Sequence, residues 1–166
     1  PVGNAGPARD NELKVAGWWI DAGPDLSLDT PAIVRVLPGH DATDPVDALC
    51  SRPWRVASAS NRQGLRLEGA ALALDAAAMP AAERISEPVA PGTVQLPADG
   101  QPIVLLADAQ THGGYPRIAH VIACDRPRLA QLRPGESVHF TPCTMEQAVA
   151  LRRGQAARLA RIALAI

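Results

Sequence analysis

The stretch Gly92–Asp108, "GTVQLPADGQPIVLLAD", decides the fold class, because in it two apolar runs meet at a sharp turn. Asp99 and Gly100 stand between the two runs, and glycine supplies the positive φ that tight hairpin turns require. Apolar runs on both sides of such a turn are typical of paired strands. The stretch therefore predicts a β-hairpin over residues 92–108.

Short apolar segments bounded by turn residues lie on both sides of this hairpin. Residues 32–39 alternate, are rich in β-branched side chains and end at Pro-Gly. Four further segments have the same form, over residues 53–58, 64–69, 117–125 and 137–143. Many short strands with few helices favour a sandwich or a closed barrel over a doubly wound sheet. The sequence therefore predicts a mainly β fold.

Helical signals are concentrated at the end of the chain. Thr144 and Gln147 have the spacing of a capping box ahead of the apolar positions Met145, Ala148, Val149, Leu151, Leu159 and Ile162. They predict a C-terminal helix, which Gly154 should weaken by roughly 1 kcal/mol. Elsewhere we expect one helical turn within residues 125–136 and a loop with a helical turn over the alanine-rich residues 71–85.

The domain organisation follows from these signals. Residues 1–17 hold Pro, Gly, Asn and scattered charge without periodicity, so we interpret them as a flexible linker or arm. Order is expected to begin near Trp18, with a barrel domain over residues 18–142 and the C-terminal helix over residues 143–166. A chain of 166 residues is long enough for one domain with a core, and too short for two comfortable ones.

Composition excludes several classes of partner. The net charge of −1 provides no field of one sign, so we expect no nucleic acid and no anionic membrane as partners. No stretch approaches the roughly 18 apolar residues that a membrane span needs, and the first residues lack a signal peptide's apolar segment. The three cysteines form no CxxC pair and the four histidines lack metal-ligand spacing. We therefore expect a cytoplasmic protein with reduced thiols and no metal site.

The strongest candidate site follows the predicted hairpin, in "DAQTHGGYPRIA" at residues 108–119. Its paired glycines Gly113 and Gly114 permit a sharp backbone path that brings amide groups close to a ligand. Six chemically versatile side chains are crowded around them: Asp108, Gln110, Thr111, His112, Tyr115 and Arg117. Loops held by rigid strands are where binding residues concentrate. The alternative interpretation is an ordinary loop between two strands.

Two weaker candidates precede it. In "SASNRQGLRLEG" at residues 58–69, Asn61 and Arg62 come just before a strand, and Arg62 or Arg66 offers a two-pronged clamp for a carboxylate or phosphate. The alternative interpretation, equally compatible with the sequence, is that each arginine is a solvated strand residue. Glu87 and Gln95 flank a Pro-Gly turn, which alone indicates turn chemistry. The chain lacks GxSxG, Walker, GxGxxG and HExxH signatures.

These segments together resemble one known family. The resemblance is carried by "RVLPG", "PWRVASASNRQGLRLEG", the long run "SEPVAPGTVQLP…GESVHF" over residues 86–140, and "EQA". They resemble the C-terminal half of the family that contains the C subunit of 5-oxoprolinase, the Kip antagonist and allophanate hydrolase subunit 2. The same unit is the carboxyltransferase A/B region of biotin-dependent urea carboxylase. The resemblance runs from about Ile33 to Val149.

The resemblance implies a fold, an activity and partners. The fold would be a cyclophilin-like closed β-barrel. The activity would be ATP-dependent opening of 5-oxoproline to glutamate, in a complex with homologues of the B subunit, of Kip inhibitor type, and of the A subunit. ATP would be a co-substrate of that complex, with no tightly bound cofactor on this chain. In urea carboxylase relatives, biotin on a partner would carry the transferred carboxylate.

Departures from the family pattern qualify this expectation. Family members carry an additional N-terminal half, so we expect this chain to be inactive alone. Gln63 and Leu65 replace an apolar residue and an aromatic residue, and His112 stands where threonine is common. Substrate choice therefore stays open between 5-oxoproline and urea or allophanate. A non-catalytic regulatory module of Kip antagonist type is the rival hypothesis, and a peptidyl-prolyl isomerase the third.

A small amide or lactam substrate sets the expected roles, which we infer from residue type. Donors for a developing oxyanion would come from Arg62, Thr111, Gly113, Gly114 and Arg117, and acceptors for the substrate nitrogen from Asn61, Asp108 and Gln110. Of these, Asp108, Gln110, Thr111 and Arg117 are the predicted catalytic residues. The predicted substrate-binding residues are Asn61, Arg62, Gln95, His112, Gly113, Gly114 and Tyr115. This prediction requires residues 58–69 and 108–119 to point into one common cleft.

Overall fold

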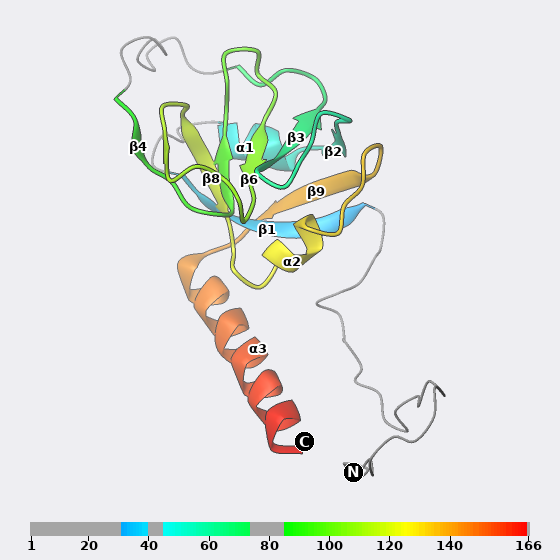
Figure 1. Ribbon diagram of the computed structural model, residues 1–166, viewed down its shortest axis with the longest axis vertical. Coiled ribbons are helices and arrows are strands. Elements are labelled where there is room, and N and C mark those ends of the chain that lie inside the picture. The colour runs from blue at the N-terminus through cyan, green and yellow to red at the C-terminus, as the bar shows by residue number, and fades with distance from the viewer. Residues whose placement is uncertain (1–30, 40–44, 74–84, 166) are drawn as a thin grey trace, which may run out of the picture.

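The computed structural model describes residues 31–39, 45–73 and 85–165. These residues form a closed β-barrel from which one long helix leads away (Figure 1). The barrel strands are β1 (Ala32–Pro38), β2 (Pro53–Val56), β3 (Gly64–Glu68), β5 (Thr93–Gln95), β6 (Ile103–Leu105), β8 (Arg117–Val121) and β9 (Ser137–Pro142). The predicted mainly β fold, a closed barrel with a C-terminal helix, is therefore confirmed.

The barrel closes through strands that are distant in sequence. Its order is β1-β8-β5-β6-β3-β2-β9, and β1 also pairs in parallel with β9, from Ala32↔Val138 to Val36↔Pro142. The other pairings within this barrel are antiparallel. Closure satisfies the backbone groups that an open sheet would leave at its edges.

Buried and more exposed side chains alternate along β1, β2 and β3. Because successive side chains of a strand point to opposite faces, the buried ones point into the barrel and form its core. Trp54 is fully buried and its indole Nε1 donates a hydrogen bond to the Leu49 carbonyl at 2.9 Å. Leu49 belongs to the short helix α1 (Pro45–Cys50), which the sequence did not predict. A six-residue helix is too short to show a clear periodicity, so only packing reveals it.

The predicted hairpin is present, with shorter strands than expected. β5 and β6 pair antiparallel through Val94↔Val104, and a loop over residues 96–102 joins them. Gly100 has a φ of 72°, and a Cβ there would lie 2.6 Å from the Leu72 carbonyl oxygen. Glycine is therefore required by conformation and by space.

The helical predictions for residues 125–136 and for the end of the chain are also confirmed. Helix α2 (Arg126–Leu129) is the helical turn expected within residues 125–136. Helix α3 (Met145–Ala165) begins at the predicted capping box, in which the Gln147 amide donates to Thr144 Oγ1 at 3.2 Å and the Thr144 amide to Gln147 Oε1 at 2.9 Å. Both bonds satisfy amide groups that a helix start would otherwise leave without partners.

A second small sheet was missed. β4 (Glu87–Pro88) pairs antiparallel with β7 (His112–Gly113), outside the barrel. Two-residue strands carry no pattern that a sequence can show, and they pair because the barrel brings their flanking segments together. The stretch 108–119 is therefore a loop that includes a short strand.

Several predictions fall outside the described residues: the linker 1–17, the start of order near Trp18, and most of the loop 71–85. Within the described ranges, no helix is long and apolar enough to span a membrane. The same residues contain no cluster of three or more histidine, cysteine or acidic side chains suited to a metal. Cys50, Cys124 and Cys143 form no disulfide with one another.

Candidate functional site

A tight turn before β3 presents Arg62. The Asn61 carboxamide oxygen accepts hydrogen bonds from the Gln63 amide at 2.9 Å and the Gly64 amide at 3.3 Å. A side chain that bonds the backbone two residues ahead is an Asx turn, which explains why asparagine occupies this position. Asn61 thus has a structural role in positioning the neighbouring Arg62.

The turn is joined to the end of the hairpin by an ion pair. Arg62 Nε lies 3.0 Å from Asp108 Oδ2. Two backbone hydrogen bonds hold the same segments together, from the Asp108 amide to the Arg62 carbonyl at 3.3 Å and from the Leu106 amide to the Gln63 carbonyl at 3.0 Å. The structure therefore brings together the Asn-Arg turn and the start of "DAQTHGGYPRIA", as the sequence predicted.

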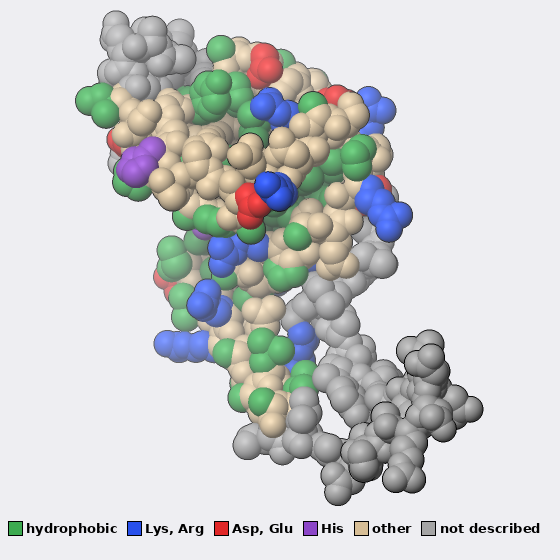
Figure 2. All heavy atoms as spheres, in the orientation of Figure 1, with side chains coloured by type: hydrophobic (Ala, Val, Ile, Leu, Met, Phe, Trp, Pro, Cys, Tyr) green, Lys and Arg blue, Asp and Glu red, His purple; other side chains and the backbone are tan. Residues whose placement is uncertain are grey.

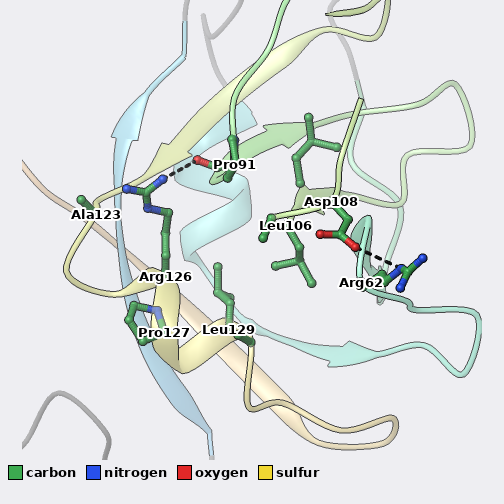
Figure 3. Close-up of a pocket in the computed structure, with 11 residues that line it drawn as sticks. Arg62, Pro91, Leu106, Asp108, Ala123, Arg126, Pro127 and Leu129 are labelled. Carbon is green, nitrogen blue, oxygen red and sulfur yellow. Dashed lines mark hydrogen bonds and ion pairs between the residues drawn. The ribbon is translucent and has the colours of Figure 1, made fainter. Parts of the chain in front are cut away.

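Arg62 and Asp108 stand at one side of a pocket of about 600 Å³ (Figure 3). Apolar side chains make up most of its wall: Pro91, Leu105, Leu106, Ala107, Ala123, Pro127, Leu129 and Ala130. Arg126 lies across the pocket from the ion pair, and its Nη1 donates to the Pro91 carbonyl at 3.2 Å. A pocket of this volume, mostly apolar with a few polar groups, is typical of small-molecule sites.

Arg126 was not among the predicted site residues. In the sequence it belongs to "DRPRL", a connection with no motif, and only the placement of α2 carries it to the pocket. Gly92 makes room for it, because a Cβ at Gly92 would lie 3.2 Å from Arg126 Cδ. Gly92 also has a φ of 97°, so another residue would be strained there. The sequence feature that could have pointed to this part of the pocket is the Pro91-Gly92 pair, which we interpreted only as a turn.

The remaining predicted residues gather around the small β4–β7 sheet. Arg117 forms an ion pair with Glu87, and the Val89 amide donates to the Thr111 carbonyl at 2.9 Å. Thr111 Oγ1 lies 3.0 Å from His112 Nδ1, and both side chains are exposed. Thr111 and His112 thus contact each other and not the large pocket.

Gln95 lies beneath this sheet. It is fully buried, and its Nε2 has no hydrogen-bond partner among the described residues. A Cβ at Gly113 would lie 2.6 Å from this nitrogen, so the glycine permits the close approach. Glycine at position 113 is explained by packing against Gln95.

Arg117 lines a second pocket of about 360 Å³, together with Thr93 and His120. Gln110, Gly114 and Tyr115 line neither pocket. Of the predicted site residues, Arg62 and Asp108 therefore line the first pocket and Arg117 lines the second. The structure does not gather all the predicted residues into one cleft. The roles assigned to these residues stay predictions.

A family comparison decides what kind of barrel this is. The model of the carboxyltransferase domain, subdomain A and B, matches residues 4–142. The chain belongs to this family. The match covers the barrel and ends before α3, and it includes most of the segment 1–17 interpreted as a linker.

Relatives of this carboxyltransferase domain agree with that assignment. The chain is 43% identical over 126 residues to the C subunit of 5-oxoprolinase from Escherichia coli, covering 74% of this chain and 39% of the relative. It is 34% identical to the solved structure of TTHA0988, with a TM-score of 0.61 over 79% of this chain and 25% of that one. The Kluyveromyces lactis urea amidolyase shares the fold, with a TM-score of 0.66 and 22% identity over 87% of this chain and 10% of that one.

The carboxyltransferase domain is thus similar to the C subunit of 5-oxoprolinase, of whose length it spans about two fifths. In its second pocket His120 is half-buried, with Nδ1 3.4 Å from Thr93 Oγ1. Burial, and secondarily the charge of Arg126, lowers the pKa of the His120 imidazole below its ordinary value. His120 therefore favours the neutral form.

Proposed function

We propose that this chain forms the lactam-binding part of a 5-oxoprolinase-type enzyme that opens 5-oxoproline to glutamate. The similarity to the C subunits of two bacterial 5-oxoprolinases supports this assignment. The proposed assembly contains homologues of the B and A subunits in the cytoplasm, with ATP as co-substrate. If the enzyme transfers a carboxyl group to urea instead, biotin on a partner would supply it.

The Arg62–Asp108 ion pair is the observation that carries the proposal. A five-membered lactam has a cis amide, so its carbonyl oxygen and its N–H lie side by side on one edge of the ring. Arg62 Nε and Asp108 Oδ2 pair with each other at 3.0 Å. Beside this contact, the remaining N–H groups of the guanidinium and the remaining lone pairs of the carboxylate offer a donor and an acceptor next to each other. The carbonyl oxygen would accept from Arg62 while the lactam N–H donates to Asp108.

The rest of the pocket matches the rest of this substrate. The ring's methylene groups would pack on the leucines of the wall, and Arg126 would bind the substrate carboxylate. When a nucleophile attacks the carbonyl carbon, negative charge develops on the oxygen that Arg62 contacts, so the guanidinium stabilises that transition state. Asp108 accepts a hydrogen bond from the lactam N–H and so keeps the ring in position for opening.

The ion pair is exposed to solvent in this chain. The Arg62 and Asp108 side chains are 86% and 51% exposed. Water weakens such electrostatic interactions, so catalysis requires that another polypeptide cover the rim of the pocket. We propose that this cover comes from the remaining length of a protein like the 5-oxoprolinase C subunit, or from a partner protein of the complex.

Asp108→Asn in the assembled complex is expected to lower kcat/KM for 5-oxoproline by about tenfold to a hundredfold, because it removes the charged acceptor and its pairing with Arg62. Steady-state 5-oxoproline-dependent ATP hydrolysis measures the effect. The matched control is Glu68→Gln in the exposed Arg55–Glu68 ion pair on the barrel. Equal activity of both variants would contradict the proposed site, and a stable complex without turnover would favour the regulatory rival.

Arg126→Ala tests the substrate class. Losing a charge-assisted hydrogen bond to the carboxylate should raise KM for 5-oxoproline by about tenfold or more, with a smaller change in kcat. Urea lacks a carboxylate, so urea-dependent turnover, if present, should not change. An unchanged KM for 5-oxoproline would remove Arg126 from the binding site.

A further inference from the structure

Helix α3 leaves the barrel after a short contact. Ala148 and Leu151 pack against a small cluster formed by Ile122, Cys124 and Cys143, and the helix then continues away from the barrel to Ala165 (Figure 1). The family model ends at residue 142, so α3 lies beyond the matched domain. Most of α3 is therefore not needed to complete the barrel core.

One face of α3 carries a mainly apolar seam that has no partner among the described residues. Met145, Val149, Arg152, Ala156, Leu159 and Ala163 are spaced alternately four and three residues apart, and all are exposed. This spacing places side chains in one line along a helix and is the pattern of coiled-coil contacts. Met145, Val149 and Leu159 are 59%, 40% and 57% exposed, and they are half of the large hydrophobic side chains exposed among the described residues.

The seam faces away from the barrel. At about 100° per residue, the seam lies on the opposite side of α3 from Leu151, Gly154 and Arg158. These three line a pocket at the joint between helix and barrel, together with Arg35 and Cys124. No described part of the barrel therefore stands in front of the seam.

The charges on α3 indicate what covers it. Of the four arginines of α3, Arg152 lies within the seam and Arg153 beside it, whereas Arg158 and Arg161 lie on the opposite side of the helix. The one acidic residue of α3, Glu146, lies outside the seam. Positively charged side chains are visible along the projecting helix in Figure 2. We propose that the seam docks an amphipathic helix of a partner polypeptide that carries acidic side chains, one of them opposite Arg152. This proposal rests on the proposed function only in that a complex of several different proteins offers such a partner.

Arg152 distinguishes this occupant from two others. It lies within the seam, so a second copy of α3 would bring like charges together at a buried interface, which costs stability. On a lipid surface it would lie in the middle of the apolar face, where charge is expensive, and the seam lacks the wide aromatic face of membrane-surface helices. A partner carboxylate satisfies the guanidinium and also sets the register of the two helices.

The probe is a synthetic helical peptide with leucine and alanine at four-three spacing and glutamates beside them, and its counterpart has lysine in place of glutamate. Fluorescence anisotropy with the full chain is expected to show binding of the acidic peptide only. Arg152→Glu should weaken this binding by about tenfold or more. Arg153→Glu, one residue away and outside the seam, should weaken it much less although it changes the same charge.

Three results would overturn the proposal. Equal losses in the two variants would indicate general charge attraction without a seam. Binding to anionic phosphatidylserine vesicles that Met145→Ser abolishes, without binding of the acidic peptide, would assign the face to a membrane. Concentration-dependent dimerisation of the chain in sedimentation would assign it to a second copy. Arg152 does not line the lactam pocket. A variant at Arg152 can therefore lose peptide binding without losing 5-oxoproline turnover, and a loss of turnover does not imply a loss of peptide binding.

Discussion

Trp54→Ala is expected to lower the free energy of unfolding by about 3–5 kcal/mol, the range for removing a fully buried large aromatic side chain. Trp54 is 0% exposed in the barrel core, and its indole N–H satisfies the Leu49 carbonyl. Its ring fills the space beside Gly69, where a Cβ would lie 2.8 Å from the indole. The neighbourhood is built around the ring, so the barrel has limited means to collapse into the cavity.

Chemical denaturation monitored by circular dichroism measures this loss. Tyr115→Ala is the matched control, because it removes an aromatic side chain that is 46% exposed, and we expect a change below about 1 kcal/mol. Trp54→Phe separates packing from the hydrogen bond, since it keeps an aromatic ring and removes the N–H donor. A midpoint for Trp54→Ala equal to that of Tyr115→Ala would show that Trp54 does not support the barrel.

Asp125→Ala is expected to cost about 3 kcal/mol or more, because it leaves a partly buried guanidinium without its partner. Asp125 is almost fully buried and accepts three hydrogen bonds from Arg35, from its amide and Nε at 2.8 Å each and from Nη2 at 2.6 Å. These bonds attach the start of α2 to β1. Losing the carboxylate therefore removes backbone and side-chain partners together.

The Arg55–Glu68 ion pair is the control for Asp125. It is exposed on the barrel surface, so Glu68→Ala should cost less than about 1 kcal/mol. The double variant Arg35→Met with Asp125→Ala should recover part of the loss, because no unpaired charge remains. Equal costs for Asp125→Ala and Glu68→Ala would mean that burial of the Arg35–Asp125 pair has no energetic consequence.

Features of the fold that depend on near neighbours were predicted from the sequence. The turn at Gly100 and the Thr144–Gln147 capping box each rest on contacts within a few residues, so their residue types were informative. The pairing of β1 with β9 was not predictable in this way, because its partners are more than a hundred residues apart. β4 and β7 were missed because two residues carry no periodicity.

The candidate site divides in the same manner. The sequence picked out Arg62 and Asp108 as functional types beside strand ends, and in the structure their ion pair joins the two segments. It also grouped Arg117 with them because of proximity along the chain, but Asp108 follows the end of β6 whereas Arg117 begins β8, where it lines another pocket with Glu87 beside it. Arg126 was passed over, since no motif surrounds it.

By itself, the sequence determined most of the barrel strands, the C-terminal helix and the family, and it predicted which residue types would bind a small amide. Only the tertiary structure decided which of them share a pocket, because the barrel order sets the neighbours of each strand end and this order depends on packing between distant segments. It also decided that α3 stands away from the barrel with its seam exposed. An amphipathic pattern predicts that a helix has an apolar face, and only the packed structure shows whether that face has a partner.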